Sequence, residues 1–417
     1  MNSSRRDFIR SVALGSTAAL LGLSNHAYAS GKRVVVIGGG SGGATAARYL
    51  RLFDPTLQVT LIEPQKRYRS SLMSGEVLIG TREASTLLFD YLKLSQLGIK
   101  LVTDRVISID SEQSTIKTQQ GDEFSYDRCI ISPGIDFQWS AIDGYNQEIT
   151  QQFPHAWRGG EQLITLKKQL TSMHDGGNII ISIPKPPYRC PSAPYERASL
   201  MAYYLQQHKP KSKVIILDAN STFDNQRGFK KVWRKYPIER ISAEEVTAFD
   251  ASNKRVTTHS GQQIKADIIN IIPPQKAGKI AATAGLVDES GWCPVNLITF
   301  ESHLKNNIHV IGDAAAIGEM SKLASSANAQ GKVCAAAVVA LLNGESLNPV
   351  PLIETSYAII GPTAAISRGA VFKPTKGGET LTLIADSLKA KKTKRYPLRE
   401  FYNAHSWYNN ITRDIFG

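Results

Sequence analysis

Short apolar runs alternate with amphipathic, alanine-rich stretches along most of the chain. The first two runs, at residues 34–37 and 59–62, are separated by one such stretch. The same order recurs at residues 178–183, 198–207 and 213–218. Strands that alternate with helices are typical of α/β proteins with parallel sheets. The pattern therefore predicts an α/β fold with two related Rossmann-like domains, each built in three layers.

A glycine motif directly follows the first apolar run. Gly38, Gly40 and Gly43 have the spacing of a dinucleotide-binding turn. Gly38 permits the tight turn, Gly40 lets a pyrophosphate approach the backbone, and Gly43 lets the helix pack close to the strand. Glu63 lies 20 residues after Gly43, where an acidic side chain can accept hydrogen bonds from an adenosine ribose. A plain glycine-rich turn would not explain Glu63, so a dinucleotide site is predicted.

Two later strand ends add to this predicted site. The run at residues 128–131 ends in a turn to Gly134, which is typical of the crossing between the domains of two-domain flavoproteins. The run at residues 308–311 ends in Gly312 and Asp313, a placement that lets Asp313 meet the ribityl and pyrophosphate region of FAD. A helix is expected at residues 329–342, with its N-terminus placed to stabilise negative charge on a reduced flavin. Together these features predict FAD as the cofactor.

The corresponding turn of the second half has a different chemistry. Residues 184–191 read PKPPYRCP. Proline fixes φ and has no backbone N–H group, so this turn cannot cradle a pyrophosphate. We therefore expect no nicotinamide cofactor here, and a small reductant that reaches the flavin directly.

These patterns divide the chain into domains. We expect a discontinuous FAD-binding domain at residues 31–145 and 276–346, and a second Rossmann-like domain at residues 146–275. Residues 347–417 contain short predicted strands and a basic stretch, and are expected to form an α+β interface domain.

The first 29 residues have the pattern of a twin-arginine signal peptide. Arg5 and Arg6 precede an uncharged run at residues 11–25, and Ala27 and Ala29 suit a signal peptidase. The run is short for a membrane span, so we expect no integral membrane contact, with an uncleaved anchor as the alternative. The pattern predicts export to the periplasm in a folded state, which suits a protein that acquires its cofactor before export.

The charge balance is basic. The formal net charge is +13, and +11 once the predicted signal peptide is removed. No module typical of nucleic-acid binding accompanies the charge, so we expect no nucleic acid. An acidic protein partner, an anionic substrate or general solubility each explain the excess. The densest stretch is expected to be a solvated loop, with Lys389, Lys391, Lys392, Lys394 and Arg395.

The four cysteines do not have the spacing of a metal site, and no metal is predicted. Cys129, Cys293 and Cys334 lie in apolar or turn segments and are expected to be packing residues. Cys190 differs because it precedes a helix expected to begin near Pro194.

The position of Cys190 suggests chemistry. The dipole of the following helix and the neighbouring Arg189 are expected to lower the pKa of the thiol. Glu196 is a candidate proton acceptor if it is partly desolvated. The alternatives are an inert, capped thiol for Cys190 and an ordinary helix charge for Glu196.

Taken together, these segments resemble the flavoprotein subunit of flavocytochrome c sulfide dehydrogenase, in the glutathione-reductase-like group. The similarity spans nearly the whole predicted mature chain. The most specific segments are residues 189–199 (RCPSAPYERAS) and 406–417 (SWYNNITRDIFG). The others are residues 34–48, 61–64, 126–134, 154–157, 271–279, 291–295 and 309–314.

The resemblance implies specific roles. In that family hydrosulfide reduces FAD through a redox-active disulfide, a glutamate acts as base, and electrons pass to a c-type cytochrome subunit. By matching motif, Cys190 is one disulfide cysteine and Glu196 is the base. Trp407, in the C-terminal motif, is expected to contact the cofactor.

Three departures from the family pattern limit these roles. Ser356 stands at the position of the second disulfide cysteine. Ser71 stands where many members attach the flavin covalently, so FAD is predicted to be non-covalent. The chain has no Cys-x-x-Cys-His haem motif, so any haem must belong to a partner.

The leading hypothesis is an exported FAD-dependent oxidoreductase that oxidises sulfide or a related sulfur species and reduces a c-type cytochrome. With Cys190 alone, either sulfide attacks the flavin directly or Cys190 carries a persulfide. A sulfide:quinone-type enzyme is one alternative, although residues 387–417 read as basic and polar without an apolar stripe. A divergent flavoprotein electron carrier is the other.

Overall fold

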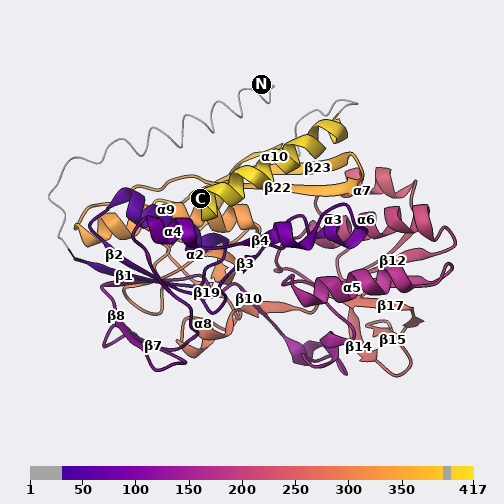
Figure 1. The fold of residues 1–417 in the computed structure, drawn as a ribbon, viewed down its shortest axis with the longest axis horizontal. Helices are drawn as coiled ribbons and strands as arrows, with labels where there is room; N and C mark the ends of the chain where they lie inside the picture. Colours follow the sequence, from indigo (N-terminus) through magenta and orange to yellow (C-terminus); the bar gives the residue numbers. More distant parts are fainter. Residues whose placement is uncertain (1–30, 388–395) are drawn as a thin grey trace.

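The computed structural model describes residues 31–387 and 396–417. The predicted signal peptide and the predicted basic loop therefore lie outside the described residues. Two α/β halves lie side by side, and a third sheet and the C-terminal helix cross over them (Figure 1). The predicted fold class is confirmed.

The first half is built on a five-stranded parallel sheet with the order β20-β9-β1-β2-β5. Residues 34–36 in its centre are almost fully buried, because parallel sheets are covered on both faces and need apolar side chains throughout. Its strands are β1 Arg33–Ile37, β2 Gln58–Ile62, β5 Lys100–Val102, β9 Arg128–Ile131 and β20 Ile308–Val310.

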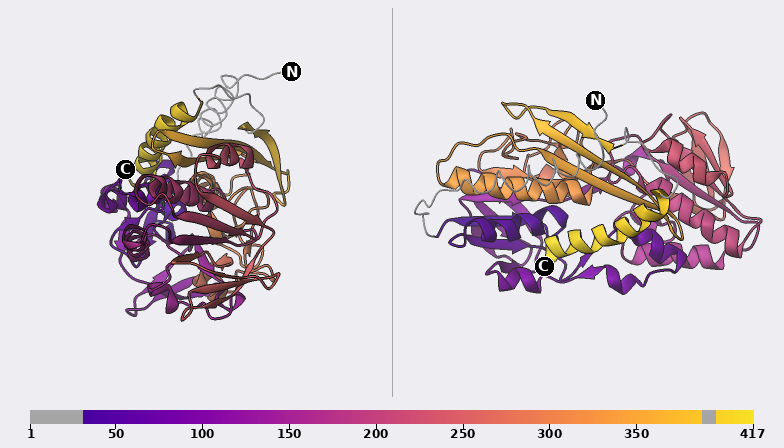
Figure 2. Two further views of the ribbon diagram at one scale, coloured as in Figure 1. Left: turned by 90° about the vertical axis from the view of Figure 1, so that its right-hand side faces the viewer. Right: turned by 90° about the horizontal axis from the view of Figure 1, so that it is seen from above.

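Two helices cover one face of this sheet and an antiparallel meander lies on the other side (Figure 1). The helices, α2 and α9, pack side by side (Figure 2). At their crossing a Cβ on Gly331 would lie 2.7 Å from the carbonyl oxygen of Gly42, so the close approach requires glycine. These elements are α2 Ser41–Phe53, α9 Ala324–Leu342, β6 Val106–Asp110, β7 Thr115–Thr118 and β8 Glu123–Ser125.

The second half repeats this plan with four parallel strands in the order β13-β12-β11-β17. Its strands are β11 Asn178–Ile183, β12 Lys213–Asp218, β13 Ile238–Ser242 and β17 Ile268–Ile271. Its meander is β14 Val246–Asp250, β15 Arg255–Thr258 and β16 Gln263–Lys265, and its helices are α5 Glu161–Ser172, α6 Ala193–His208 and α7 Gln226–Trp233. An antiparallel pair, β10 Ile135–Phe137 and β18 Gln275–Ala277, connects the halves.

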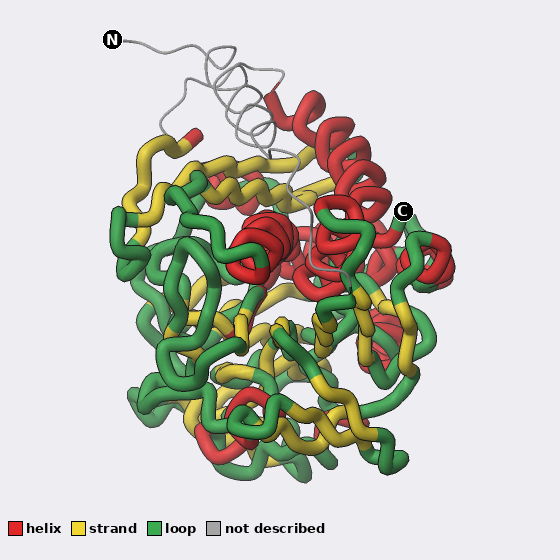
Figure 3. Tube along the Cα trace, turned by 90° about the vertical axis from the view of Figure 1, so that its left-hand side faces the viewer, coloured by secondary structure: helices red, strands yellow, loops and turns green. Residues whose placement is uncertain are grey.

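The C-terminal part is an antiparallel sheet, β22-β23-β24, with the long helix α10 against it. Figure 3 shows this helix on the outside of the molecule, beside the strands. The elements are β22 Leu352–Gly361, β23 Ala364–Pro374, β24 Leu381–Asp386 and α10 Tyr396–Phe416. Shorter elements complete the fold: β3 Tyr68–Arg69, α3 Ser74–Ile79, β4 Leu88–Phe89, α4 Leu92–Gln96, α8 Lys279–Thr283, β19 Cys293–Pro294 and β21 Ala315–Ala316.

The structure corrects the expected start of α9. The helix begins at Ala324, five residues before the predicted start at residue 329. Serine and asparagine favour turns when they are considered alone. Here they are buried in the helix, and the Asn328 side chain donates hydrogen bonds to Thr45 Oγ1 and Asp414 Oδ2, each at 2.9 Å.

Two expectations for the C-terminal part were wrong. The strands β22 and β23 are not short, because they have 10 and 11 residues. The last helix does have a buried face, which contains Tyr408, Ile411 and Ile415. Glu400 and Thr412 are buried on it as well, and these polar positions hid the apolar stripe in the sequence.

Candidate functional site

One cavity of about 1060 Å³ is lined by most of the predicted site residues. It is bounded by the β1–α2 turn, the start of α6, β22 and α10. The predicted residues that line it are Gly38, Gly40, Glu63, Ser71, Gly134, Cys190, Glu196, Gly312, Asp313 and Trp407, together with Ser356.

Gly43 is not among the lining residues, but it shapes the turn beneath them. A Cβ at Gly43 would lie 1.9 Å from the carbonyl oxygen of Gly38, so only glycine allows the helix to start this close to the strand. Gly38 has φ +95°, and a Cβ there would lie 2.4 Å from Ser132 O. Glu63 faces the same turn and accepts a hydrogen bond of 2.8 Å from the Gly39 amide.

The cavity fits FAD on two independent grounds. The first is the glycine cradle, which brings backbone N–H groups and the start of a helix to an open space. The second is the buried indole nitrogen Nε1 of Trp157, which has no hydrogen-bond partner among the described residues and belongs to a cavity-lining side chain. Arg105, Arg158 and Lys279 also line the cavity and supply positive charge for an anionic group.

Asp313 lies at the cavity but already has a partner. Its Oδ2 forms an ion pair of 2.6 Å with Arg189 Nε. The pair connects the turn after β20 to Arg189, the residue that precedes Cys190. Arg189 and Asp313 are 124 positions apart along the chain.

The predicted thiolate at Cys190 is wrong. Burial, and then the nearby Glu196 carboxylate, raise the pKa of the Cys190 thiol to about 12. The Arg189 charge that was expected to lower this pKa is neutralised by Asp313. The helix-dipole argument considers the end of α6 alone, and desolvation of the thiolate outweighs it.

Glu196 is desolvated, as its proposed role as a proton acceptor requires. Burial raises the pKa of Glu196 to about 8, Glu76 adds to the rise, and a hydrogen bond from the Ile359 amide opposes it. At neutral pH the carboxyl group therefore holds its proton, and it titrates within the range in which general bases work well. Ser356 lines the same cavity, so the structure brings a thiol, a carboxyl group and a hydroxyl group to one space.

The sequence reasoning did not single out Arg197, the residue after Glu196. Its buried guanidinium donates to the carbonyl oxygens of His155 and Ala156 at 2.8 and 2.7 Å. It also lies 4.9 Å from the centre of the Trp157 ring. Arg197 thus fixes the loop that carries the unpartnered Trp157 indole, and its position inside the segment at residues 189–199 was the available signal.

The other cysteines are packing residues, as expected. Cys129, Cys293 and Cys334 are fully buried, whereas Cys190 is half-buried. None of the four cysteines forms a disulfide.

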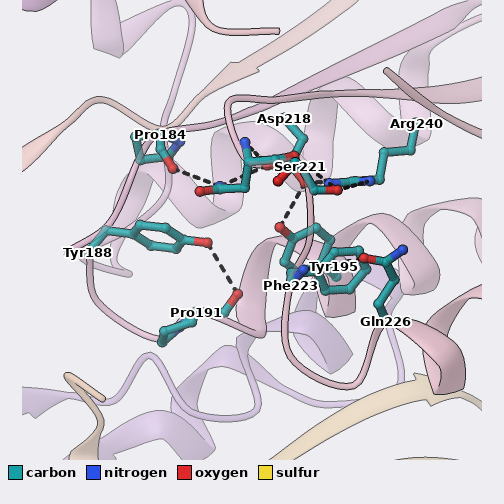
Figure 4. Close-up of polar contacts among 10 residues, drawn as sticks. Pro184, Tyr188, Pro191, Tyr195, Asp218, Ser221, Phe223, Gln226 and Arg240 are labelled. Carbon is teal, nitrogen blue, oxygen red and sulfur yellow. Dashed lines mark hydrogen bonds and ion pairs between the residues drawn. The ribbon is translucent and has the colours of Figure 1, made fainter. Parts of the chain in front are cut away.

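In the second half, side chains pack around the end of β12 (Figure 4). Asp218, at the end of β12, is fully buried and accepts hydrogen bonds from Tyr195 Oη at 2.8 Å and Arg240 Nε at 2.7 Å. The Tyr195 ring stacks on Phe223 with centroids 3.6 Å apart. The acid that corresponds to Glu63 is therefore bound internally, and aromatic rings pack beside it.

Comparisons with known proteins agree with the fold and the cavity. Residues 32–170 match the pyridine nucleotide-disulphide oxidoreductase model, and this match and the fold define an FAD-dependent oxidoreductase. Residues 163–273 match the central domain of the sulfide dehydrogenase [flavocytochrome c] flavoprotein chain, and residues 349–416 match the flavin-binding domain of flavocytochrome c sulphide dehydrogenase. The chain belongs to this family of sulfide-oxidising flavoproteins, which confirms the resemblance and FAD as the cofactor.

Individual relatives give the same picture. The sulfide dehydrogenase flavoprotein chain of Chlorobaculum thiosulfatiphilum is 52% identical over 46 residues, which cover 11% of this chain and 96% of that sequence. The mitochondrial sulfide:quinone oxidoreductase of Mus musculus is 24% identical over 315 residues, or 71% of this chain and 68% of the relative. A solved sulfide:quinone oxidoreductase from Aquifex aeolicus shares the fold, with a TM-score of 0.73, 18% identity, and coverage of 92% and 91% of the two chains.

Proposed function

We propose that this protein is an exported enzyme that oxidises sulfide at Cys190 and Glu196 and passes the electrons, through non-covalent FAD, to a c-type cytochrome. The observation that carries the proposal is the shared cavity, in which Cys190 and Glu196 lie with the glycine cradle. The family supports sulfide as the substrate. FAD, when bound, supplies a two-electron acceptor.

The side chains account for the proton that this oxidation releases. Joining hydrosulfide to the Cys190 thiol as a persulfide releases two electrons and one proton. Burial keeps Cys190 protonated, with a pKa of about 12, so the thiol needs a base beside it. Glu196, with a pKa of about 8, is that base once it is deprotonated. Attack of a second hydrosulfide on the persulfide then restores the Cys190 thiol and releases hydrodisulfide.

Ser356 and Ser71 stand at two positions where the family pattern has cysteine, and each changes the proposed chemistry. A hydroxyl group at position 356 cannot form a disulfide with Cys190, so the persulfide must leave by an external nucleophile. A hydroxyl group at position 71, also on the cavity, supports a non-covalent flavin. Protein denatured in acid should therefore release all of its flavin into the supernatant.

The electron acceptor and the location rest on other features. A c-type cytochrome is supported by the family, whose name is that of a flavocytochrome, and by the net charge of +11 without the predicted signal peptide, which favours an acidic partner. Export to the periplasm is supported by the twin-arginine pattern of the first 29 residues.

A quinone is the second candidate acceptor. The similarity to sulfide:quinone oxidoreductases favours it, and so does α10, whose outer side exposes Leu398 and Tyr402 by 44% and 64%. Among the described residues, no helix has the length and apolar character needed to cross a membrane.

Anaerobic reduction and acceptor assays test these proposals together. Sulfide should bleach the flavin of the wild type, and a c-type cytochrome should restore the colour faster than a soluble quinone analogue does. Cys190→Ala should abolish the bleaching, whereas Cys334→Ala, at a fully buried position outside the cavity lining, should not. A wild-type flavin that dithionite bleaches and sulfide does not would instead support an electron carrier without sulfide chemistry. Faster reoxidation by quinone would favour the second candidate.

A further inference from the structure

Lys322 is a buried lysine that the reaction described above does not use. Its side chain is 6% exposed. The ammonium group donates hydrogen bonds to the carbonyl oxygens of Asp313 at 2.7 Å and Ala315 at 2.9 Å. It also lies 3.7 Å from the centre of the Trp292 ring, which is a favourable position for a cation. Lys322 is therefore bound to the turn that follows β20, and Gly312 and Asp313 of that turn line the cavity.

The backbone of Lys322 is connected to the reactive thiol. Its carbonyl oxygen accepts a hydrogen bond of 2.8 Å from the Cys190 amide. Cys190 has φ +54°, a left-handed conformation that is unfavourable for a residue with a side chain. Such a conformation persists only where the surroundings hold it.

A second connection runs in parallel with the first. Arg189 Nε pairs with Asp313 Oδ2 at 2.6 Å, and the Arg189 amide donates to Gln275 Oε1 at 2.8 Å. Residues 189–190 are thus bound on one side through an ion pair to Asp313 and on the other side through Lys322 to the same turn. Two independent links from one turn to another fix the distance between them.

We propose that Lys322 is a positioning residue, which holds the strained Cys190 turn against the Gly312–Ala315 turn and so sets the place of the thiol in the cavity. The proposal rests on the proposed function only in that Cys190 is the thiol that reacts with sulfide. When the ammonium group is replaced by an apolar side chain, the Asp313 and Ala315 carbonyls lose their donor. The hydrogen bonds that hold Lys322 against the Gly312–Ala315 turn are then absent.

The test compares Lys322→Met with Lys209→Met. Lys209 is a matched control, because it is 7% exposed and its ammonium group also donates to two carbonyl oxygens, those of Thr171 and Met173, outside the cavity lining. Each purified holoprotein is alkylated in the native state with iodoacetamide, and the labelled cysteine is identified by mass spectrometry. Cys190 is the one cysteine that is not fully buried, so the label reports its turn directly. Anaerobic flavin reduction by sulfide and by dithionite is then measured for each variant.

We expect Lys322→Met to keep its FAD and to be reduced by dithionite at the wild-type rate. Alkylation should be at least threefold faster and confined to Cys190, while reduction by sulfide should be at least tenfold slower. Lys322→Arg, which restores a cation, should recover part of the sulfide rate. Lys209→Met should match the wild type in all of these measurements.

Several outcomes would overturn the proposal. Alkylation of Lys322→Met at the wild-type rate would do so, whether or not sulfide proves to be the substrate. Labelling that extends to Cys129, Cys293 and Cys334 would show a general loss of structure in place of a released turn. If alkylation changes as expected but sulfide fails to reduce even the wild type, the positioning role stands and the proposed function fails.

Discussion

The two α/β halves share a plan of strand, helix and strand, but their first turns have opposite properties. In the first half the β1–α2 turn is built from glycines and opens onto the cavity, with Glu63 at the end of the next strand facing that turn. In the second half the β11–α6 turn is rich in proline, and Asp218 at the end of the next strand is sealed by Tyr195 and Arg240.

The difference shows how one plan serves two purposes. A cofactor site needs a turn whose backbone N–H groups face an open space and an acidic side chain that lines the same space. The second half provides neither feature at these positions. Its helix start instead contributes to the cavity of the first half, because α6 and the turn before it bring Glu196 and Cys190 to the lining of that cavity.

The largest effect is expected at Gly43, where the start of α2 packs against the backbone of Gly38. Gly43→Val places a side chain where even a Cβ would lie 1.9 Å from a backbone oxygen. Overpacking of this kind commonly costs about 1–3 kcal/mol and more where backbone must move. We expect no soluble, yellow protein after expression, measured as the flavin absorbance of the purified fraction. A yellow Gly43→Val protein with a wild-type melting temperature would show that the close contact between Gly43 and Gly38 does not require glycine.

Loss of the hydrogen bonds that Asp218 accepts from Tyr195 and Arg240 should destabilise the protein without affecting the flavin. Asp218→Ala leaves the buried Arg240 guanidinium without its partner, and such a loss costs about 3–5 kcal/mol. Thermal unfolding should show a large drop in the melting temperature, while the flavin spectrum at 10 °C and the sulfide reaction are retained.

The matched control for Asp218→Ala uses a neighbouring pair of the same two strands. Lys213 and Glu239 form an ion pair of 2.9 Å in which both side chains are about half exposed, so Glu239→Gln should cost only about 0–1 kcal/mol. Equal destabilisation by both substitutions would contradict the stabilising role assigned to the buried Asp218 contacts.

Glu196 should show how the start of α6 works in catalysis. Removal of a general base slows a reaction by about 10²–10⁴-fold. Sulfide reduction of the wild-type flavin should rise with pH through about 8, the pKa of Glu196, because the base acts when deprotonated. Glu196→Gln should be slow and lack this step, and since the ionisation of sulfide is common to both proteins, the difference between the two profiles isolates Glu196.

The same raised pKa makes a prediction about stability. The folded protein holds the Glu196 proton up to a pH of about 8, whereas the unfolded chain releases it near 4.5. Between these values the unfolded state binds fewer protons, so stability falls as pH rises. Glu196→Gln should therefore melt above the wild type at pH 9 and at the same temperature at pH 4. A lower melting temperature for the variant at pH 9 would contradict the desolvation of this carboxyl group.

The smallest effect is expected at Gly40, and it separates cofactor binding from folding. A Cβ there would meet only the Tyr68 ring at 3.8 Å, so the apoprotein should tolerate Gly40→Ala. If the pyrophosphate of FAD approaches this backbone, the added methyl group should weaken FAD binding by about tenfold, or about 1.4 kcal/mol. Titration of the apoprotein with FAD measures this, and unchanged affinity would place the pyrophosphate elsewhere.

Features that depend on neighbouring residues were predictable from the sequence. The strands, the glycine turn and the proline turn were found because their signals lie within a few positions. Cys190 and Glu196 were found in the same way, and the structure brings both to the cavity.

Features that depend on distant residues were not predictable. The pKa of Cys190 was assigned the wrong direction because burial of the thiol raises it, and because Asp313, which is distant in the sequence, pairs with Arg189. The buried ion pair of Asp218 with Arg240 was not predicted because Arg240 comes from the next strand. The buried face of α10 was missed because Glu400 and Thr412 interrupt it, and only the packing against β23 reveals it.

The central claim is that the flavin of this protein is reduced through the Cys190 side of its cavity and not by a nucleotide bound in the second half. The most direct measurement is anaerobic addition of sulfide, and separately of NADH, to the yellow holoprotein, with the flavin absorbance followed over time. The account predicts rapid bleaching by sulfide, its loss in Cys190→Ala, and no bleaching by NADH. Rapid bleaching by NADH, or equal bleaching by sulfide in Cys190→Ala, would contradict it.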